Sequence, residues 1–365
     1  MENNKIQIAF AATDKEWSTT IPSFKEGEAR GKSFITYGED NLIPEYLHSL
    51  YDTVSSLRTI INGTTDFVIG DDIECNIEGF NFEVNRKGDT IRELATLLVR
   101  DYLIYGGYAI QVIRNLAGKV SELYYIDFRY LRSDKNNDLF WYSEEYDKRY
   151  VRSSKTLVYP KFIPEAISVP SSIVYVKNEK SQTYPSPCYK AALKDCEIER
   201  QIDEYHLAAL ENGFGGSYVM NFNGGIPDDE QKAEIEENIN EKFAGASNAG
   251  RILLNFCNSK DNALTLEKLE IQDFSEKYQA AATRSREQIY CAFQAVPALF
   301  GLMSESTGFN EQEFQQSFRL YNRTKVKSIQ RMVCDSFDKI FQVKGSITIT
   351  PFSIEENGEK EEEVE

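Results

Sequence analysis

The chain has 365 residues, 41% of them hydrophobic, and a formal net charge of −17 at pH 7. This length predicts two or three structural units with a substantial buried core, and the composition excludes a disordered protein. The acidic excess is spread along the chain, which argues against sequence-specific DNA binding through a basic surface. The six cysteines are scattered and only two histidines occur, so we expect neither structural zinc nor a disulfide framework.

Residues 1–40 show no clear periodicity and are predicted to form an N-terminal arm, with a short strand near residues 6–12. Apolar residues spaced three and four apart then predict a helix from Pro44 to about Gly63. A second helix is expected between Thr90 and Gly106, followed by a hairpin of strands 108–113 and 120–126. Residues 40–180 are therefore predicted to form one α+β unit.

Pro187 near its start and Gly213 just beyond its end delimit the next predicted helix. Asp195, Glu199 and Asp203 form an acidic row on it, between two apolar stripes. Like charges four residues apart cost a few tenths of a kcal/mol each in an isolated helix. The row is therefore either a solvated face or a row that faces the channel of a ring of helices packed through both stripes.

A β-α-β-β insert is predicted at residues 214–271, and a helix with a capping-box start follows it and stops before Pro297. After a small, polar loop, a last long helix begins at Asn310 and leads to a strand at 346–352 and an acidic tail. This helix carries the chain's one basic concentration, formed by Arg319, Arg323, Lys325, Lys327 and Arg331.

The motifs of common active sites are missing from the sequence. It contains no phosphate-binding P-loop, no dinucleotide-binding glycine pattern and no G-x-S-x-G elbow. Asp134, Asn136, Asp138 and Glu145 have the spacing of a calcium loop, but Leu139 stands where that loop requires glycine. We predict no catalytic residue, no cofactor and no metal site. Acidic pairs such as Glu39-Asp40 leave a metal-dependent hydrolase as an alternative.

Several short motifs, taken in order, resemble the portal proteins of tailed bacteriophages over roughly residues 40–350. They are Asn41-Leu42-Ile43-Pro44-Glu45, Tyr105-Gly106-Gly107-Tyr108-Ala109, Tyr184-Pro185-Ser186-Pro187, Asn248-Ala249-Gly250-Arg251 and Val296-Pro297-Ala298-Leu299-Phe300-Gly301. The resemblance implies an α+β portal fold with a wing, a two-helix stem and an α/β clip. It also implies assembly into a ring, usually of twelve subunits, with a central channel.

The resemblance also divides the chain. It implies an N-terminal arm (1–40), a wing (41–185), stem helix 1 (186–213), a clip (214–272), stem helix 2 (273–297), a tunnel-loop region (298–310), a long wing helix with the final strand (311–352) and an acidic tail (353–365). The DNA-facing residues of the tunnel loop would be Met303, Ser304, Glu305, Ser306, Thr307, Gly308 and Phe309.

A portal would sit at one capsid vertex of the virion, after assembly in the host cytoplasm, and would pass double-stranded DNA without sequence specificity. The implied partners are further copies of the chain, the terminase large subunit, a head-tail adaptor and the major capsid or scaffolding protein. An acidic stem would keep the duplex mobile, because a wall that attracted phosphates would hold it. The two alternatives to a portal are the metal-dependent hydrolase and a non-conducting oligomeric adaptor or scaffold.

Overall fold

The computed structural model describes residues 21–28, 33–144, 146, 156–211, 218–222, 227–228, 231–232, 235, 252–256, 274–302 and 311–353. The chain divides into two compact units. One unit comprises Met1–Thr20 and Ile198–Thr283, and the other comprises Ile21–Glu197 and Arg284–Glu365. We refer to them as the small and the large unit. No described helix is long and apolar enough to span a membrane.

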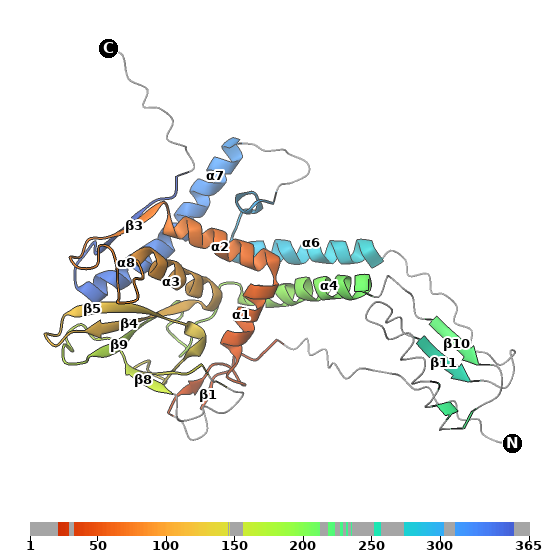
Figure 1. The fold of residues 1–365 in the computed structure, drawn as a ribbon. Helices are drawn as coiled ribbons and strands as arrows, with labels where there is room; N and C mark the ends of the chain where they lie inside the picture. The colour runs from red at the N-terminus through yellow and green to blue at the C-terminus, as the bar shows by residue number, and fades with distance from the viewer. Residues whose placement is uncertain are drawn as a thin grey trace, which may run out of the picture. The chain divides into compact units, whose positions relative to one another are not determined.

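A three-stranded antiparallel sheet lies at the centre of the large unit (Figure 1). Its order is β5-β4-β9, with β4 at Gly107–Arg114, β5 at Val120–Ile126 and β9 at Ser171–Lys177. The predicted hairpin is confirmed, with Ala109 opposite Ile126 and Gly118 in the turn at φ +77°.

A second sheet of five strands has the order β1-β2-β6-β7-β8. Its strands are β1 (Gly27–Glu28), β2 (Ile35–Thr36), β6 (Leu131–Ser133), β7 (Leu139–Tyr142) and β8 (Leu157–Pro160). Residues from Ile21 onward thus belong to the large unit, although the sequence assigned all of 1–40 to an arm. Tyr37 shows why: its ring stacks on Tyr184 at 4.2 Å and its hydroxyl donates to the Pro185 carbonyl oxygen.

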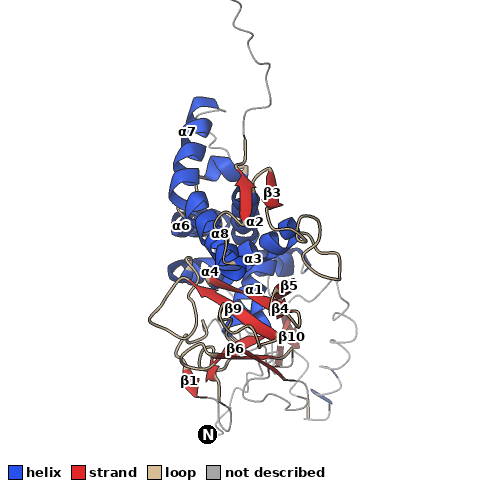
Figure 2. Ribbon diagram, turned by 90° about the vertical axis from the view of Figure 1, so that its left-hand side faces the viewer, coloured by secondary structure: helices blue, strands red, loops and turns tan. Residues whose placement is uncertain are grey.

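Helices α2, α3 and α8 lie on one side of the central sheet and the five-stranded sheet lies on the other (Figure 2). A line of aromatic rings joins these layers. Tyr105 on α3 stacks on Phe128, Phe128 stacks on Tyr175 of β9, and Tyr175 contacts Phe140 of β7, with ring centroids 5.1–5.6 Å apart. All four rings belong to one contiguous hydrophobic core.

Where the sequence predicted one helix from Pro44, the structure has two, α1 (Ile43–Thr53) and α2 (Ser55–Ile69). Val54 separates them in an extended conformation and is completely buried. No glycine or proline marks this break in the sequence. We attribute the turn to the burial of the Val54 side chain rather than to a backbone preference. Helix α2 also continues past Gly63, where the sequence placed the end, and stops at Gly70.

The predicted boundaries of α3 (Ile91–Tyr105) are confirmed. Thr90 and Glu93 form a reciprocal capping box at its start, and Gly106 ends it in the left-handed conformation at φ +86°. A side chain at Gly106 would lie 2.4 Å from the Ser186 carbonyl oxygen, so the position needs glycine for space as well as for φ.

The predicted long basic helix is interrupted. Helix α7 (Glu311–Tyr321) and helix α8 (Lys327–Phe341) are joined by a π-helical segment, Asn322–Val326. After α8, strand β12 (Ile347–Thr350) pairs antiparallel with β3 (Asp72–Cys75). The predicted final strand is therefore present and joins the two sequence segments of the large unit.

Helix α4 (Leu193–Glu211), which follows a 3-10 turn at Lys190–Ala192, and helix α6 (Phe274–Phe293) both run from one unit into the other. In the large unit Tyr189 stacks on Phe293 at 5.4 Å, and in the small unit Tyr205 stacks on Tyr278 at 4.8 Å. Aromatic contacts therefore join the two predicted stem segments within each unit.

The small unit contains strands β10 (Tyr218–Phe222) and β11 (Ile252–Phe256), which pair in parallel. Of the predicted helix between them, residues 231, 232 and 235 are described as helical, and the Asp228 carboxylate accepts the backbone N–H of Gln231. The predicted last strand of the insert, residues 264–271, lies outside the described residues.

Candidate functional surfaces

The predicted tunnel loop, Met303–Phe309, lies outside the described residues, but both of its flanks are described. On the incoming side α6 ends at Phe293, and Gln294 takes a left-handed conformation at φ +54°. The Ala295 N–H then donates to the Tyr290 carbonyl oxygen, which closes the helix before Pro297. Pro297 instead opens the short helix η5 (Pro297–Phe300). The outgoing flank is α7.

A cluster of aromatic side chains, here called the aromatic platform, holds both flanks. Its members are Phe67, Tyr290, Phe300, Phe318, Tyr321 and Phe352. Phe67 on α2 contacts Phe300, Phe318 and Phe352 edge to face, with centroids 5.2–5.9 Å apart. Edge-to-face pairs contribute about 0.5–1.5 kcal/mol each beyond their burial. The flanks of residues 303–310 are therefore fixed to one helix.

Two details lock the platform to α2. Phe300 lies against the backbone of Gly63, where a Cβ would be 2.8 Å from the ring. The hydroxyls of Thr64 and Tyr321, 2.7 Å apart, form a buried hydrogen bond. The contact with Phe300 explains the glycine in the middle of α2, and its only signal in the sequence is a glycine inside a helical pattern.

The basic residues predicted on the last long helix lie at the surface of α7, the π-helical segment and α8. Arg319, Arg323, Lys327 and Arg331, here called the basic row, are exposed, and Lys325 is half-buried. Within the part of the chain that the structure describes, no member of the row forms an ion pair. The row is thus a cationic surface on which no described ion pair neutralises a member.

The acidic residues predicted on the first stem helix differ in exposure. Asp203 is exposed and Asp195 is half-buried, whereas Glu199 is only 4% exposed. Glu199 therefore lies in the interior of this chain and is not part of an exposed row, which corrects the sequence-based grouping. Of the apolar stripes beside it, Cys196 and Ile202 are buried, whereas Ile198, Tyr205 and Leu207 are exposed. The orientation of Asp195 and Asp203 toward a channel stays a prediction.

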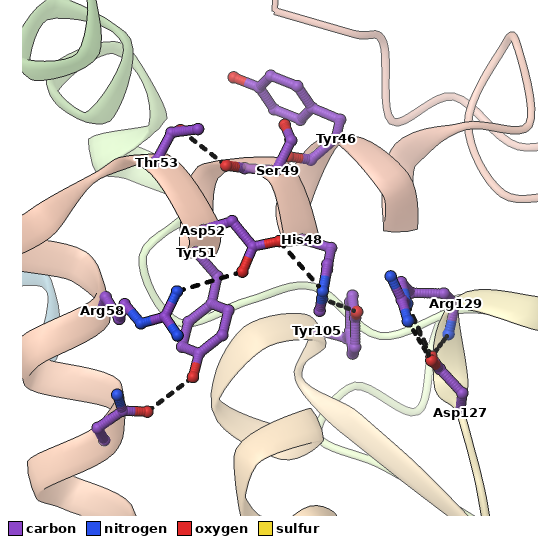
Figure 3. Close-up of polar contacts among 11 residues, drawn as sticks. Tyr46, His48, Ser49, Tyr51, Asp52, Thr53, Arg58, Tyr105, Asp127 and Arg129 are labelled. Atoms are coloured by element: carbon purple, nitrogen blue, oxygen red, sulfur yellow. Dashed lines mark hydrogen bonds and ion pairs between the residues drawn. The ribbon is translucent and has the colours of Figure 1, made fainter.

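His48 is at the centre of a polar network between α1 and α3 (Figure 3). Its Nε2 lies 3.4 Å from Asp52, and its Nδ1 lies 3.0 Å from the Tyr105 hydroxyl. A carboxylate can only accept, so Nε2 carries the proton and Tyr105 donates to Nδ1. Arg58 pairs with the other oxygen of Asp52 at 3.4 Å.

The His48 network resembles a catalytic triad in composition, but its geometry serves packing. Tyr105 is 1% exposed and stacks on Phe128, so no substrate could reach its hydroxyl. Burial and the nearby Arg129 guanidinium lower the pKa of His48. Asp101, one turn before Tyr105 on α3, is also buried, and this burial raises the pKa of its carboxyl well above the ordinary value. Its carboxylate accepts a hydrogen bond from the Tyr125 hydroxyl at 3.0 Å.

The described residues contain no group of three His, Cys, Asp or Glu side chains that could hold a metal ion. The carboxylate of Asp134, the first residue of the possible calcium loop, accepts the N–H groups of Asp138 and Leu139 instead and forms a turn.

A groove of about 340 Å³ lies between β9 and α8, and its charged lining residues are Arg331, Asp335 and Lys339.

Comparison with known proteins gives a family match. A family model described as "Phage portal protein" matches residues 84–354. An uncharacterised protein of Rickettsia felis (strain ATCC VR-1525 / URRWXCal2) is 27% identical over 179 residues, which are 47% of this chain and 43% of the relative. The chain thus spans less than half the length of that relative.

Two solved structures share the fold. The first, described as the virion of a native gene transfer agent (GTA) particle, has 17% identity and a TM-score of 0.52 over 85% of this chain and 84% of that chain. The second, the neck of the native GTA particle computed with C12 symmetry, has 18% identity and a TM-score of 0.52 over 84% of each chain.

The Gly63–Phe300 contact predicts an unusual response to substitution. Alanine normally stabilises a helix interior by up to about 1 kcal/mol over glycine. Here Gly63→Ala should lower the melting temperature by roughly 2–6 °C, because overpacking costs about 1–3 kcal/mol. Phe300→Leu should restore part of the loss in the double variant. A melting temperature that rises in Gly63→Ala, as at an open helical site, would contradict the close contact.

The lowered pKa of His48 predicts a pH dependence. The unfolded chain binds a proton at a higher pH than folded His48 does, so this residue's contribution is present above pH 6.5 and is lost as pH falls. We expect His48→Gln to lose less thermal stability than the wild type between pH 7.5 and 5.5. His206→Gln, at the chain's exposed second histidine, is the control. Parallel profiles for wild type and His48→Gln would refute the assignment.

Proposed function

Because the chain belongs to the phage portal protein family, we propose that it forms the ring at one capsid vertex through which double-stranded DNA enters and leaves a virion. The match over residues 84–354 carries this proposal, since it includes most of the large unit, both long connecting helices and the flanks of the predicted tunnel loop. The protein acts in this role as a structural conduit rather than an enzyme.

The proposed parts follow the chain. The large unit is the wing, α4 and α6 form the stem, and the small unit contains the clip. Residues 303–309 form the tunnel loop around the duplex. The aromatic platform supports this assignment, because a loop that contacts a moving polymer needs rigid anchors at both ends.

The ring has proposed partners. Copies of the chain close the ring, and the terminase large subunit and a head-tail adaptor dock on it outside the capsid. The major capsid or scaffolding protein surrounds it at the vertex. DNA passes without sequence-specific contacts, which agrees with a net charge of −17.

Assembly is the direct test. Native mass spectrometry with negative-stain imaging of the purified protein should show a ring of about a dozen subunits with a central hole wide enough for a duplex. A closed oligomer without a hole would favour a non-conducting adaptor instead. A protein that stays monomeric after co-expression with its capsid or scaffolding protein would count against the portal role.

A second prediction concerns the stem. If Asp195 and Asp203 face the channel, Asp195→Lys with Asp203→Lys should make the assembled ring bind duplex DNA more tightly, with a steeper loss of affinity as salt rises. Glu78→Lys with Glu83→Lys makes the same charge change at exposed wing positions and is the matched control. Equal gains in both variants would show a net-charge effect and would leave no reason to place Asp195 and Asp203 in the channel.

A further inference from the structure

The basic row has a candidate counterion in the chain's own sequence. Residues 354–365 contain seven glutamates and one lysine. The glutamates are Glu355, Glu356, Glu359, Glu361, Glu362, Glu363 and Glu365. Such a run cannot bury enough apolar surface to fold alone. The distance from residues 354–365 to the basic row is therefore set by the position of Ser353, the last described residue.

The last described residues lie against the start of the basic row. Phe352 packs on Phe67 at 5.2 Å and on Phe318 at 5.9 Å, and Phe318 directly precedes Arg319 on α7. The Ser353 N–H donates to the Asp71 carboxylate at 3.2 Å. These contacts fix the point from which residues 354–365 continue, next to the first arginine of the row.

Residues 354–365 match the basic row in both length and charge. Arg319 and Arg331 are twelve residues apart, which corresponds to about 18 Å along helical structure. Twelve extended residues reach about 40 Å, so residues 354–365 can follow the whole row. Four exposed cations spaced four residues apart repel one another unless an anion lies beside them.

We propose that residues 354–365 lie along the basic row of their own chain and act as a built-in polyanion that occupies it. Each exposed ion pair is weak, but the tether keeps the glutamates at a high local concentration beside the row. The contact is therefore sensitive to salt and is displaced by a stronger polyanion such as duplex DNA. This arrangement shields the basic row from nonspecific capture of DNA.

Zero-length carbodiimide cross-linking tests the contact directly. At low salt we expect an amide between a glutamate of residues 354–365 and Lys325 or Lys327, found by mass spectrometry in the band of the monomer mass after denaturation. The cross-link should disappear in about 0.5 M salt. Lys119, exposed in the β4–β5 turn, is the control lysine. Equal cross-linking to Lys119, or cross-links found only in covalent dimers, would overturn the proposal.

Binding to a 30-base-pair duplex tests the shielding. Removal of residues 354–365 should raise the affinity at low salt about tenfold or more and should steepen the slope of log K against log salt by about 3–4. The gain should vanish when Arg319, Arg323, Lys327 and Arg331 are also changed to glutamine, a set whose folding is checked by its melting temperature. A gain that survives in the combined variant, or no gain at all, would refute the proposal.

Neither experiment needs an assembled ring. Failure of the portal proposal would therefore leave the predicted cross-link and affinity changes intact, and failure of this inference would leave the ring prediction intact.

Discussion

The close approach of Phe300 to Gly63 is the constraint on which the arrangement of the large unit depends. With the ring at that distance from the α2 backbone, Phe67 can meet aromatic side chains from η5, α7 and the end of the chain's last strand. Three segments distant in sequence thus share one helix as a support. A side chain at position 63 would displace the Phe300 ring from α2, and the segments that pack on Phe67 would shift with it.

This support determines where several candidate functional segments begin. Residues 303–310 start from η5 and end at α7, and both flanks rest on α2. The basic row begins one residue after Phe318, and residues 354–365 begin two residues after Phe352. One apolar cluster therefore sets the starting points of the proposed tunnel loop, the cationic surface and its proposed counterion.

The sequence predicted those elements whose ends are encoded locally. The Thr90–Glu93 capping box, Gly106 and the turn at Gly118 act through their own backbone chemistry, so α3 and the hairpin appear where expected. It failed where tertiary packing decides. The chain turns at Val54 because its side chain is buried. The π-helical segment Asn322–Val326 contains no proline or glycine that would have predicted it. Glu199 is buried although Asp195 and Asp203 are not. The tunnel-loop residues rested on family resemblance alone, and the helical pattern around Asp195 and Asp203 left a solvated face and a channel-facing row as open alternatives.

The charge distribution gives the proposed functions a common physical basis. In a chain of net charge −17, four exposed cations on consecutive turns repel one another by a few tenths of a kcal/mol per pair and would attract duplex DNA, which the proposed conduit must release. The proposed tethered polyanion would reduce both the repulsion and the attraction for DNA, because it neutralises the row in the free protein. Only a partner with greater charge density would displace it. The proposed acidic stem would oppose DNA binding by repulsion, and the basic row would oppose it by prior occupancy. The two surfaces then act in the same direction despite their opposite signs.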